Sequence, residues 1–341
     1  MRLCTRICLS GGIVATLMAP CAAFAQSSVT LYGVLDAYVG SLRRSDEAVR
    51  SNGQNNGGLT TSYFGVRGNE DLSGGWQTFF AFESFLQVPT GAAGRTSADP
   101  FWSRNAYLGF SGPLGRVSFG RQMTLLYTAT GRFNSFGPSA NLSPVMLQGW
   151  KTPYNPAILG DNIWNNMVKY ETPDILGFKI SGAYGYAGTT ANRDGAHNLS
   201  FSVIYTHGPF GAVVSTQQVE YGTGMLATIP SQKAWMAGAM YDFKVVKLYA
   251  QYFHTNATGI DTTTGTTQLG FSVPVGPGII MVEAARTKRD MPTNTTTRTM
   301  ETVGYSYYLS KRTDLYAAYF LDKLTGYSRT GNFALGMRHR F

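Results

Sequence analysis

The chain is poor in cysteine, in charge and in long apolar runs. Its three cysteines all lie within the first 25 of 341 residues, so the rest of the chain can form neither a disulfide nor a cysteine-ligated metal site. Charged residues make up 14% of the chain, well below the roughly 25% of an average soluble domain. No apolar run after residue 25 is long enough for a transmembrane helix, and a mean hydropathy of −0.10 argues against a bundle of membrane helices.

Catalytic and metal-binding motifs are also missing. The chain has no phosphate-binding loop, dinucleotide fingerprint, nucleophile elbow or zinc-protease motif. Its four histidines show no metal-ligand spacing; they are His197, His207, His254 and His339. We therefore expect no enzyme activity, no cofactor and no bound metal. The formal net charge is +9, but no run of lysines or arginines exists, so we expect no nucleic-acid partner.

The first 25 residues have the pattern of a secretory signal peptide. Arg2 and Arg6 precede a short, mostly apolar stretch at 7–19, and Ala23-Phe24-Ala25 matches an A-x-A cleavage site. The apolar stretch is too short for a membrane anchor. We therefore predict a signal peptide over 1–25 and an exported protein without disulfides, for which a closed β-barrel is a stable solution because its sheet has no open edge.

Glycine, aromatic residues and regular alternation are what the chain has in abundance. It contains 40 Gly, 20 Tyr and 20 Phe, and glycine and aromatic residues are poor helix formers. Apolar residues alternate with small or polar ones in 29–39, 303–309 and 333–341. An apolar residue at every second position is typical of strands that bury or shield one face.

The connectors between these segments follow a strict order. Seven tight connectors, most of them with Gly, Pro or Asp, alternate with eight longer polar stretches. The tight connectors are 71–75, 111–115, 173–177, 207–211, 242–245, 274–277 and 310–313. The longer stretches are about 42–59, 88–101, 122–161, 188–195, 222–231, 257–264, 290–297 and 324–331. Seven and eight connectors make fifteen, which separate sixteen strands.

An even number of strands with short turns at one end and long loops at the other is typical of a transmembrane β-barrel. We therefore predict an all-β, 16-stranded antiparallel barrel over 26–341, with both termini at the short-turn end. A secreted β-sandwich would also have short strands and glycine-rich turns. It does not explain the strict alternation of long and short connectors.

Several segments also resemble a known family. They are SSVTLYGVLDAYVG (27–40), YFGVRGNEDL (63–72), AYLGFSGPLGRVSFGRQ (106–122), VGYSYYLSKRTDLYAAY (303–319) and GMRHRF (336–341). In these segments the chain resembles the trimeric general porins of Gram-negative bacteria, in the branch typical of β-proteobacteria. The resemblance implies a homotrimeric outer-membrane barrel whose third long loop folds inward and narrows the pore. It also implies that 88–101 reaches a neighbouring subunit and that Phe341 is presented to the outer-membrane assembly machinery.

The longest connector, 122–161, is the predicted constriction loop. It is too apolar for a solvated lid, so we expect it to pack against the inner wall. From Gln122 to Gly160 it contains no Asp or Glu, and its only charges are Arg132 and Lys151. Pores of the family often oppose an acidic inner loop to a basic wall, so this loop departs from that pattern.

The charged residues of the strands predict which ions the pore favours. Alternation places Arg67 and Lys169 on the lumen face, and Arg121 lies at the root of the loop. We predict a basic pore lining made by Arg67, Arg121, Arg132 and Lys169. We predict that three acids line the same lumen: Asp36, Glu83 and Glu171. An excess of one sign in a narrow channel focuses the field on passing ions, so we expect a mild preference for anions.

These observations predict an outer-membrane porin that passes ions and small hydrophilic solutes by passive diffusion. One alternative is a substrate-selective porin in which Tyr127, Trp150 and Tyr154 bind an aromatic or carboxylated solute; it predicts saturable uptake. Another is a structural or adhesive barrel, which predicts no conductance. A barrel enzyme is the third alternative, and a lipid-hydrolysis assay would detect it.

Overall fold

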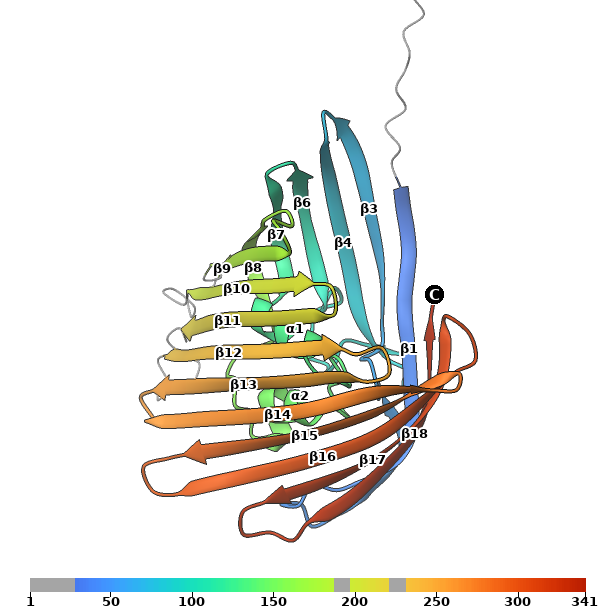
Figure 1. Cartoon of the computed structure of the whole chain (residues 1–341), viewed down its shortest axis with the longest axis vertical. Coiled ribbons are helices and arrows are strands. Elements are labelled where there is room, and N and C mark those ends of the chain that lie inside the picture. Colours follow the sequence, from blue (N-terminus) through green and yellow to red (C-terminus); the bar gives the residue numbers. More distant parts are fainter. Residues whose placement is uncertain (1–27, 187–196, 221–230) are drawn as a thin grey trace, which may run out of the picture.

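A computed structural model describes residues 28–186, 197–220 and 231–341 as one antiparallel sheet closed into a barrel (Figure 1). The predicted signal peptide at 1–25 and most of the predicted loops at 188–195 and 222–231 lie outside these residues. No described helix is long and apolar enough to cross a membrane.

Sixteen strands form the wall. They are β1 (Ser28–Leu42), β3 (Tyr63–Ser73), β4 (Trp76–Gln87), β6 (Asn105–Gly112), β7 (Gly115–Met123), β8 (Ile163–Glu171), β9 (Phe178–Gly185), β10 (Asn198–His207), β11 (Phe210–Glu220), β12 (Ser231–Asp242), β13 (Lys247–Thr258), β14 (Thr262–Val275), β15 (Gly278–Asp290), β16 (Thr295–Tyr308), β17 (Thr313–Leu324) and β18 (Thr330–Arg340). Two short strands belong to loops. β2 (Ser51–Asn56) pairs with the end of β1, and β5 (Ala92–Ala93) pairs with the end of β4.

The barrel closes where its two terminal strands meet. β1 pairs with β3 along its first half and with β18 along its second half. Gly33 N–H donates to the Phe341 carbonyl at 3.2 Å, and Phe341 N–H donates to the Gly33 carbonyl at 3.1 Å. The predicted 16-stranded barrel is confirmed, and its closure satisfies the backbone hydrogen bonds of strands that must cross lipid.

The two faces of each strand differ as the alternation predicts. On β1, Val29 and Leu31 are 70% and 64% exposed on the outer surface, whereas Asp36 on the lumen side is fully buried. On β18, Phe333 and Leu335 lie outside and Ala334 is buried inside. The outer surface is therefore apolar over the height that lipid covers.

The seven tight connectors are confirmed, but two of the longer ones are shorter than predicted. β13 and β14 continue until only residues 259–261 separate them, and only 291–294 separate β15 from β16. The segments predicted as loops at 257–264 and 290–297 are therefore mostly strand. Their threonines have a branched Cβ that favours extended backbone, and above the lipid a strand needs no apolar face.

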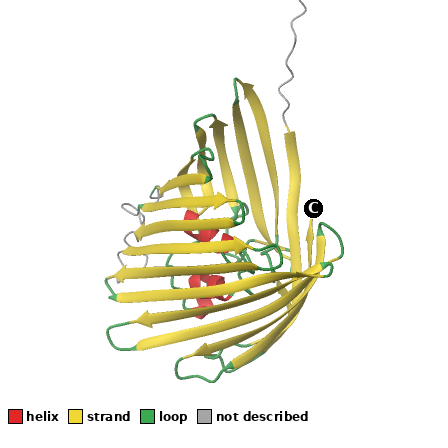
Figure 2. Ribbon diagram, in the orientation of Figure 1, coloured by secondary structure: helices red, strands yellow, loops and turns green. Residues whose placement is uncertain are grey.

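The connector between β7 and β8 lies inside the barrel, where Figure 2 shows its helices enclosed by strands. It contains α1 (Leu125–Arg132), α2 (Pro144–Trp150) and the 3₁₀ turn η1 (Thr152–Tyr154). Residues 124–162 are called the inner loop below. The side chains of Thr124 and Ser143 cap the two helices by accepting from Tyr127 N–H and Met146 N–H.

Candidate functional site

The inner loop is fixed to the wall by a continuous apolar contact. Leu126, Phe133 and Met146 of the loop are at most 1% exposed, and they pack against Met236 of β12 and Phe253 of β13. Full burial of each such side chain stabilises the contact by about 1.5–3 kcal/mol. This is the packing that the apolar composition of 122–161 predicts, and the inward fold of the loop is confirmed.

A second apolar cluster fixes the middle of the loop on the other side. Phe136, Leu142 and Leu147 pack in a cluster with Met300 of β16 and Phe320 of β17. The two clusters cover the lumen side of β11–β17. The open channel therefore runs between the inner loop and the opposite wall, which is built from β1 and β3–β8.

A buried carboxylate holds the N-terminus of α2. Glu283 on β15 is fully buried, and it accepts from Val145 N–H at 2.9 Å and from the Ser143 hydroxyl at 3.0 Å. A carboxylate at a helix N-terminus is stabilised by the helix dipole and by the free N–H groups there. Glu283, which the sequence analysis did not single out, therefore joins the inner loop to the wall.

Asp36 has a comparable structural role in the first long loop. It accepts from the N–H groups of Gly58, Leu59 and Thr60 at 2.8–2.9 Å and from the Tyr316 hydroxyl at 2.6 Å. Its lumen parity is as predicted, but the side chain is fully buried. Asp36 therefore fixes residues 58–60 and has no surface toward the channel.

Glu83 lies on the open wall, where neighbouring donors surround it. It accepts from the Tyr32 hydroxyl, the Arg104 guanidinium and the Asn105 amide, and it is 4% exposed. Arg104 also lies over the ring of Tyr63, at 3.9 Å. The negative charge of Glu83 is therefore neutralised within the wall, by an arginine that the sequence analysis missed.

Three arginines reach the lumen without such a partner. Arg67 lies over the ring of Tyr32 at 4.6 Å, and Arg116 over the ring of Phe79 at 3.7 Å. Arg132, at the end of α1, donates to the Thr206 hydroxyl of β10 at 3.1 Å. Within the part of the chain that the structure describes, none of the three has a carboxylate oxygen within 4 Å. We call Arg67, Arg116 and Arg132 the free arginines.

The remaining predicted charges form pairs. Lys169 and Glu171, two residues apart on β8, make an ion pair of 3.3 Å. Arg121 follows a β-bulge in β7, donates to the Ser103 carbonyl at 2.7 Å, and lies 3.6 Å from Asp161. The sequence-predicted set therefore divides into residues exposed in the lumen and residues whose charge is compensated.

A clip of opposite charges joins the second long loop to the inner loop. Arg95 binds Asp99 at 2.8 Å and Asp161 at 2.9 Å. Burial of Asp99 opposes its charged form, but the hydrogen bonds and charge of Arg95 outweigh burial and hold the pKa of Asp99 below its ordinary value. The acids at this edge of the channel are therefore ionised and already paired.

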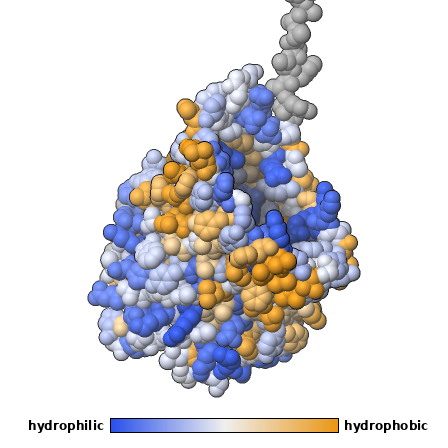
Figure 3. Space-filling view, in the orientation of Figure 1, coloured by the Kyte–Doolittle hydropathy of each residue, from blue (hydrophilic) through white to orange (hydrophobic). Residues whose placement is uncertain are grey.

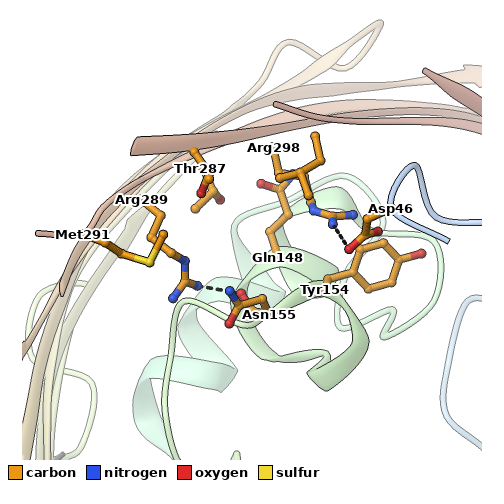
Figure 4. Close-up of a pocket in the computed structure, with 10 residues that line it drawn as sticks. Asp46, Gln148, Tyr154, Asn155, Thr287, Arg289, Met291 and Arg298 are labelled. Atoms are coloured by element: carbon orange, nitrogen blue, oxygen red, sulfur yellow. Dashed lines mark hydrogen bonds and ion pairs between the residues drawn. The ribbon is translucent and has the colours of Figure 1, made fainter. Parts of the chain in front are cut away.

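A small cavity of about 160 Å³ lies at the loop end of the channel (Figure 4). On one side, Arg298 pairs with Asp46 at 3.0 Å. On the other, Arg289 donates to the Asn155 carbonyl at 2.6 Å. Gln148 also lines the cavity, and its buried Oε1 accepts no hydrogen bond from the described residues. The cavity thus presents a guanidinium and an unused acceptor.

Two of the aromatic residues considered for solute binding lie in the apolar contact of the loop. The rings of Tyr127 and Trp150 pack edge to face at 5.3 Å, and Trp150 also contacts Phe253. Tyr127 is 7% exposed. Tyr154 alone of the three lines the cavity at the loop end.

The arginines that the sequence analysis missed differ in how readily they could be found. Arg116 has the same parity as the buried Ser118 on β7, so the alternation rule would have found it. Arg104 precedes its strand, and Arg289 lies in a segment predicted as a loop from residue 290, so parity gave little information on either.

The chain matches the family model described as Gram-negative porin over residues 12–326. It belongs to the Gram-negative porins. This porin is 31% identical to outer membrane porin protein 32 of Delftia acidovorans over 311 residues, which cover 89% of this chain and 86% of that protein. It is 26% identical to an outer membrane porin protein of Bordetella pertussis, with coverage of 94% and 96%.

Solved structures show the same architecture. The anion-selective porin from Comamonas acidovorans superposes with a TM-score of 0.75 at 26% identity, covering 93% of this chain and 100% of that chain. The trimer form of OmpT from Vibrio cholerae superposes with a TM-score of 0.67 at 16% identity, covering 92% and 99%. This second likeness concerns the fold alone.

Family and fold together establish the function in outline. This porin is an outer-membrane protein, and a barrel of sixteen strands encloses more space than side chains fill, so an aqueous channel remains. The inner loop narrows that channel along one wall. Small hydrophilic solutes and ions therefore cross it by passive diffusion, and the architecture is that of a channel rather than of an enzyme.

Proposed function

We propose that this porin conducts small anions in preference to cations. The observation that carries the proposal is the unequal pairing of charges in the lumen. Asp36 and Glu83 are buried and hydrogen-bonded, and Glu171 is paired with Lys169. The free arginines have no such partner among the described residues. In a channel with low-dielectric walls, uncompensated positive charge raises the local concentration of anions. A structural relative of this chain, from Comamonas acidovorans, is an anion-selective porin, which agrees with the proposal.

A planar-bilayer recording under a KCl gradient tests this preference. We expect a reversal potential on the chloride side for the wild type. The triple substitution Arg67→Gln, Arg116→Gln and Arg132→Gln should lower the chloride-to-potassium permeability ratio several-fold. The matched control removes three positive charges outside the lumen, at Lys311, Arg312 and Lys323. If the triple variant and the control have the same reversal potential as the wild type, the proposed role of the free arginines is wrong.

We further propose that the porin is a homotrimer. Aromatic side chains gather on the outer surface of β3 and β4 and on the adjoining second long loop. The ring of Phe64 lies 6.1 Å from Phe101, and Trp102 lies 4.8 Å from Phe101 and 5.6 Å from Phe82. Phe101 is 55% exposed. Large exposed aromatic patches are typical of subunit interfaces, and the predicted contact of 88–101 with a neighbour falls on this patch.

Export and assembly complete the proposal. The signal peptide predicted over 1–25 would direct the chain out of the cytoplasm. Phe341, the last residue, is 39% exposed beside Gly33. We propose that it is the signal for the assembly machinery. Replacing Phe341 by Ala should reduce the amount of folded protein in outer membranes, measured as the heat-modifiable band on gels.

The cavity at the loop end supports a second candidate, a porin with a solute-binding step. Arg289 and the unpaired Oε1 of Gln148 would suit a carboxylated solute that also has a hydroxyl group. Uptake that saturates with solute concentration, and loses saturation in Arg289→Gln, would favour this candidate. Flux that rises linearly would favour general diffusion.

A further inference from the structure

A second group of cations lies on the outer surface of the barrel, away from the channel. Tyr252 and His254 of β13, Gly265 of β14, and Arg286 and Lys288 of β15 line a hollow of about 470 Å³. Their strand neighbours on the lumen side are buried, as Phe253 and Thr287 are at 1% and 7% exposure. Because side chains alternate along a strand, the hollow opens outward, toward the membrane or its surface.

The hollow lies immediately beyond the apolar belt. In the row below it, Leu269 is 61% exposed and pairs with Ala284. Arg286 is two residues farther along β15, about 7 Å toward the loop end. Trp235 and Tyr252, with rings 5.5 Å apart, flank this level, and aromatic residues of barrels concentrate where lipid meets water. Figure 3 shows mostly hydrophilic residues over the loop ends of these strands.

The space in the hollow results from the glycine at its floor. A Cβ atom at Gly265 would lie 2.8 Å from the Tyr252 hydroxyl, so the absent side chain allows this ring to lie across β14. The hydroxyl group has no hydrogen-bond partner among residues 28–186, 197–220 and 231–341. It is therefore free to donate to a ligand in the hollow.

The charges of the hollow are unbalanced. Lys288 pairs with Asp290 at 3.0 Å, and the Thr295 hydroxyl also donates to Asp290. Arg286 has no carboxylate within 4 Å in the described part of the chain. A lipid-facing arginine costs free energy that grows with depth, so an exposed, unpaired guanidinium at this level is best explained by an anionic group that belongs to the membrane.

We propose that this hollow binds a phosphate group of the phosphorylated glycolipid in the outer leaflet of the Gram-negative outer membrane. Arg286 binds two phosphate oxygens side by side, because a guanidinium matches their spacing. Lys288 adds a second charge, and Tyr252 and His254 add hydrogen-bonding groups. The sugar and acyl part of the lipid lies along the apolar belt below. The site is outside the channel, so it is independent of the proposed anion selectivity.

Native mass spectrometry of the protein purified from outer membranes tests the proposal. The probe is a diphosphorylated disaccharide glycolipid titrated into detergent solution. Because each surface cation adds to the attraction for an anionic lipid, the variant Arg286→Gln/Lys288→Gln should bind it at least about tenfold more weakly. The control Lys323→Gln, an exposed cation of β17 outside the hollow, should bind as the wild type does. Single-channel conductance should be unchanged in both variants, which shows that they are folded.

Three results would overturn the proposal. Equal glycolipid affinity of the double variant and the wild type would remove the cations from recognition. Equal binding of the enzymatically dephosphorylated glycolipid would show that acyl chains alone are recognised. Displacement of the glycolipid by millimolar inorganic phosphate would assign the site to free phosphate instead.

Discussion

At the scale of single residues, the position of a charge on a strand does not determine what it does. Asp36, Glu83 and Glu171 share lumen parity, yet Asp36 fixes a loop, Glu83 neutralises Arg104, and Glu171 pairs with Lys169. The difference arises from donors supplied by distant segments. Burying a carboxylate without partners is costly, so each of the two buried acids is surrounded by N–H and O–H groups.

Gly33 offers a sharp test at this scale, because it lies at the closure of the barrel. A Cβ atom there would lie 2.6 Å from both the Tyr63 carbonyl oxygen and Cζ of Phe341. We expect Gly33→Ala to destabilise the folded barrel by about 1–3 kcal/mol through overpacking. The measurement is the temperature at which the folded band on a semi-native gel converts to the unfolded one.

The matched control is Gly182→Ala on β9, where an added Cβ would meet nothing within 4 Å. Both glycines face outward from wall strands, so they differ mainly in the space available. If the two variants unfold at the same temperature, the close approach of Phe341 to Gly33 contributes nothing to stability.

At the scale of elements, the inner loop depends on the wall for its structure. α1 has eight residues and α2 has seven, and helices this short are not stable alone in water. Their apolar residues are buried against β10–β16, and Glu283 compensates the free N–H groups of α2. The position of the constriction is thus decided by a few contacts that cross the lumen.

We expect Glu283→Gln to loosen the inner loop without unfolding the barrel. The amide keeps the volume but removes the charge, and a hydrogen bond to a charged group contributes about 1.5–3 kcal/mol. The open-channel current should become noisier, and trypsin should cut the native protein faster after Arg132 or Lys151. Ser143→Ala, which removes one donor to the same carboxylate, should have a smaller effect in the same direction.

Glu301→Gln is the control for this prediction. Glu301 lies on β16, beside Glu283's strand but on the outer face, and its pair with Arg329 at 3.6 Å is exposed, so it contributes little. Equal noise and equal trypsin sensitivity in the Glu283 and Glu301 variants would contradict the anchoring role of Glu283.

At the scale of the whole molecule, the outer surface has regions of different character. The aromatic patch of Phe64, Phe82, Phe101 and Trp102 lies on one side, over β3, β4 and the second long loop. The basic hollow lies on β13–β15, and an apolar belt occupies the strands between. Lipid alone would favour the same belt all round, so the two exceptions mark different neighbours: another subunit, and charged headgroups.

The patch makes a prediction about assembly. Phe101→Ala/Trp102→Ala should weaken the trimer by at least about 2 kcal/mol per subunit, as central aromatic residues of interfaces commonly do. Size-exclusion chromatography with light scattering, in mild detergent, would then show a shift from trimer to monomer. Phe201→Ala, which removes a 47% exposed ring from the outer face of β10, should leave the trimer intact. A trimer equally stable in both variants would place the interface elsewhere.

The sequence by itself determined the barrel. Alternation and turn residues are local properties that need no distant partner, so they predicted sixteen strands, the tight turns and the lipid-facing side chains. The apolar composition of 122–161 also predicted that this loop would fold inward. Strand ends were less certain, because the threonines of 257–264 suit either a polar loop or a strand above the lipid.

Only the tertiary structure decided the electrostatics of the channel. Whether an arginine is free, as Arg67 is, or compensated, as Arg104 is, depends on carboxylates that are distant in sequence and brought near by closure of the barrel. The same holds for Glu283, whose partners lie about 140 residues earlier. Coulomb attraction falls with distance in space, and distance along the chain does not reveal it.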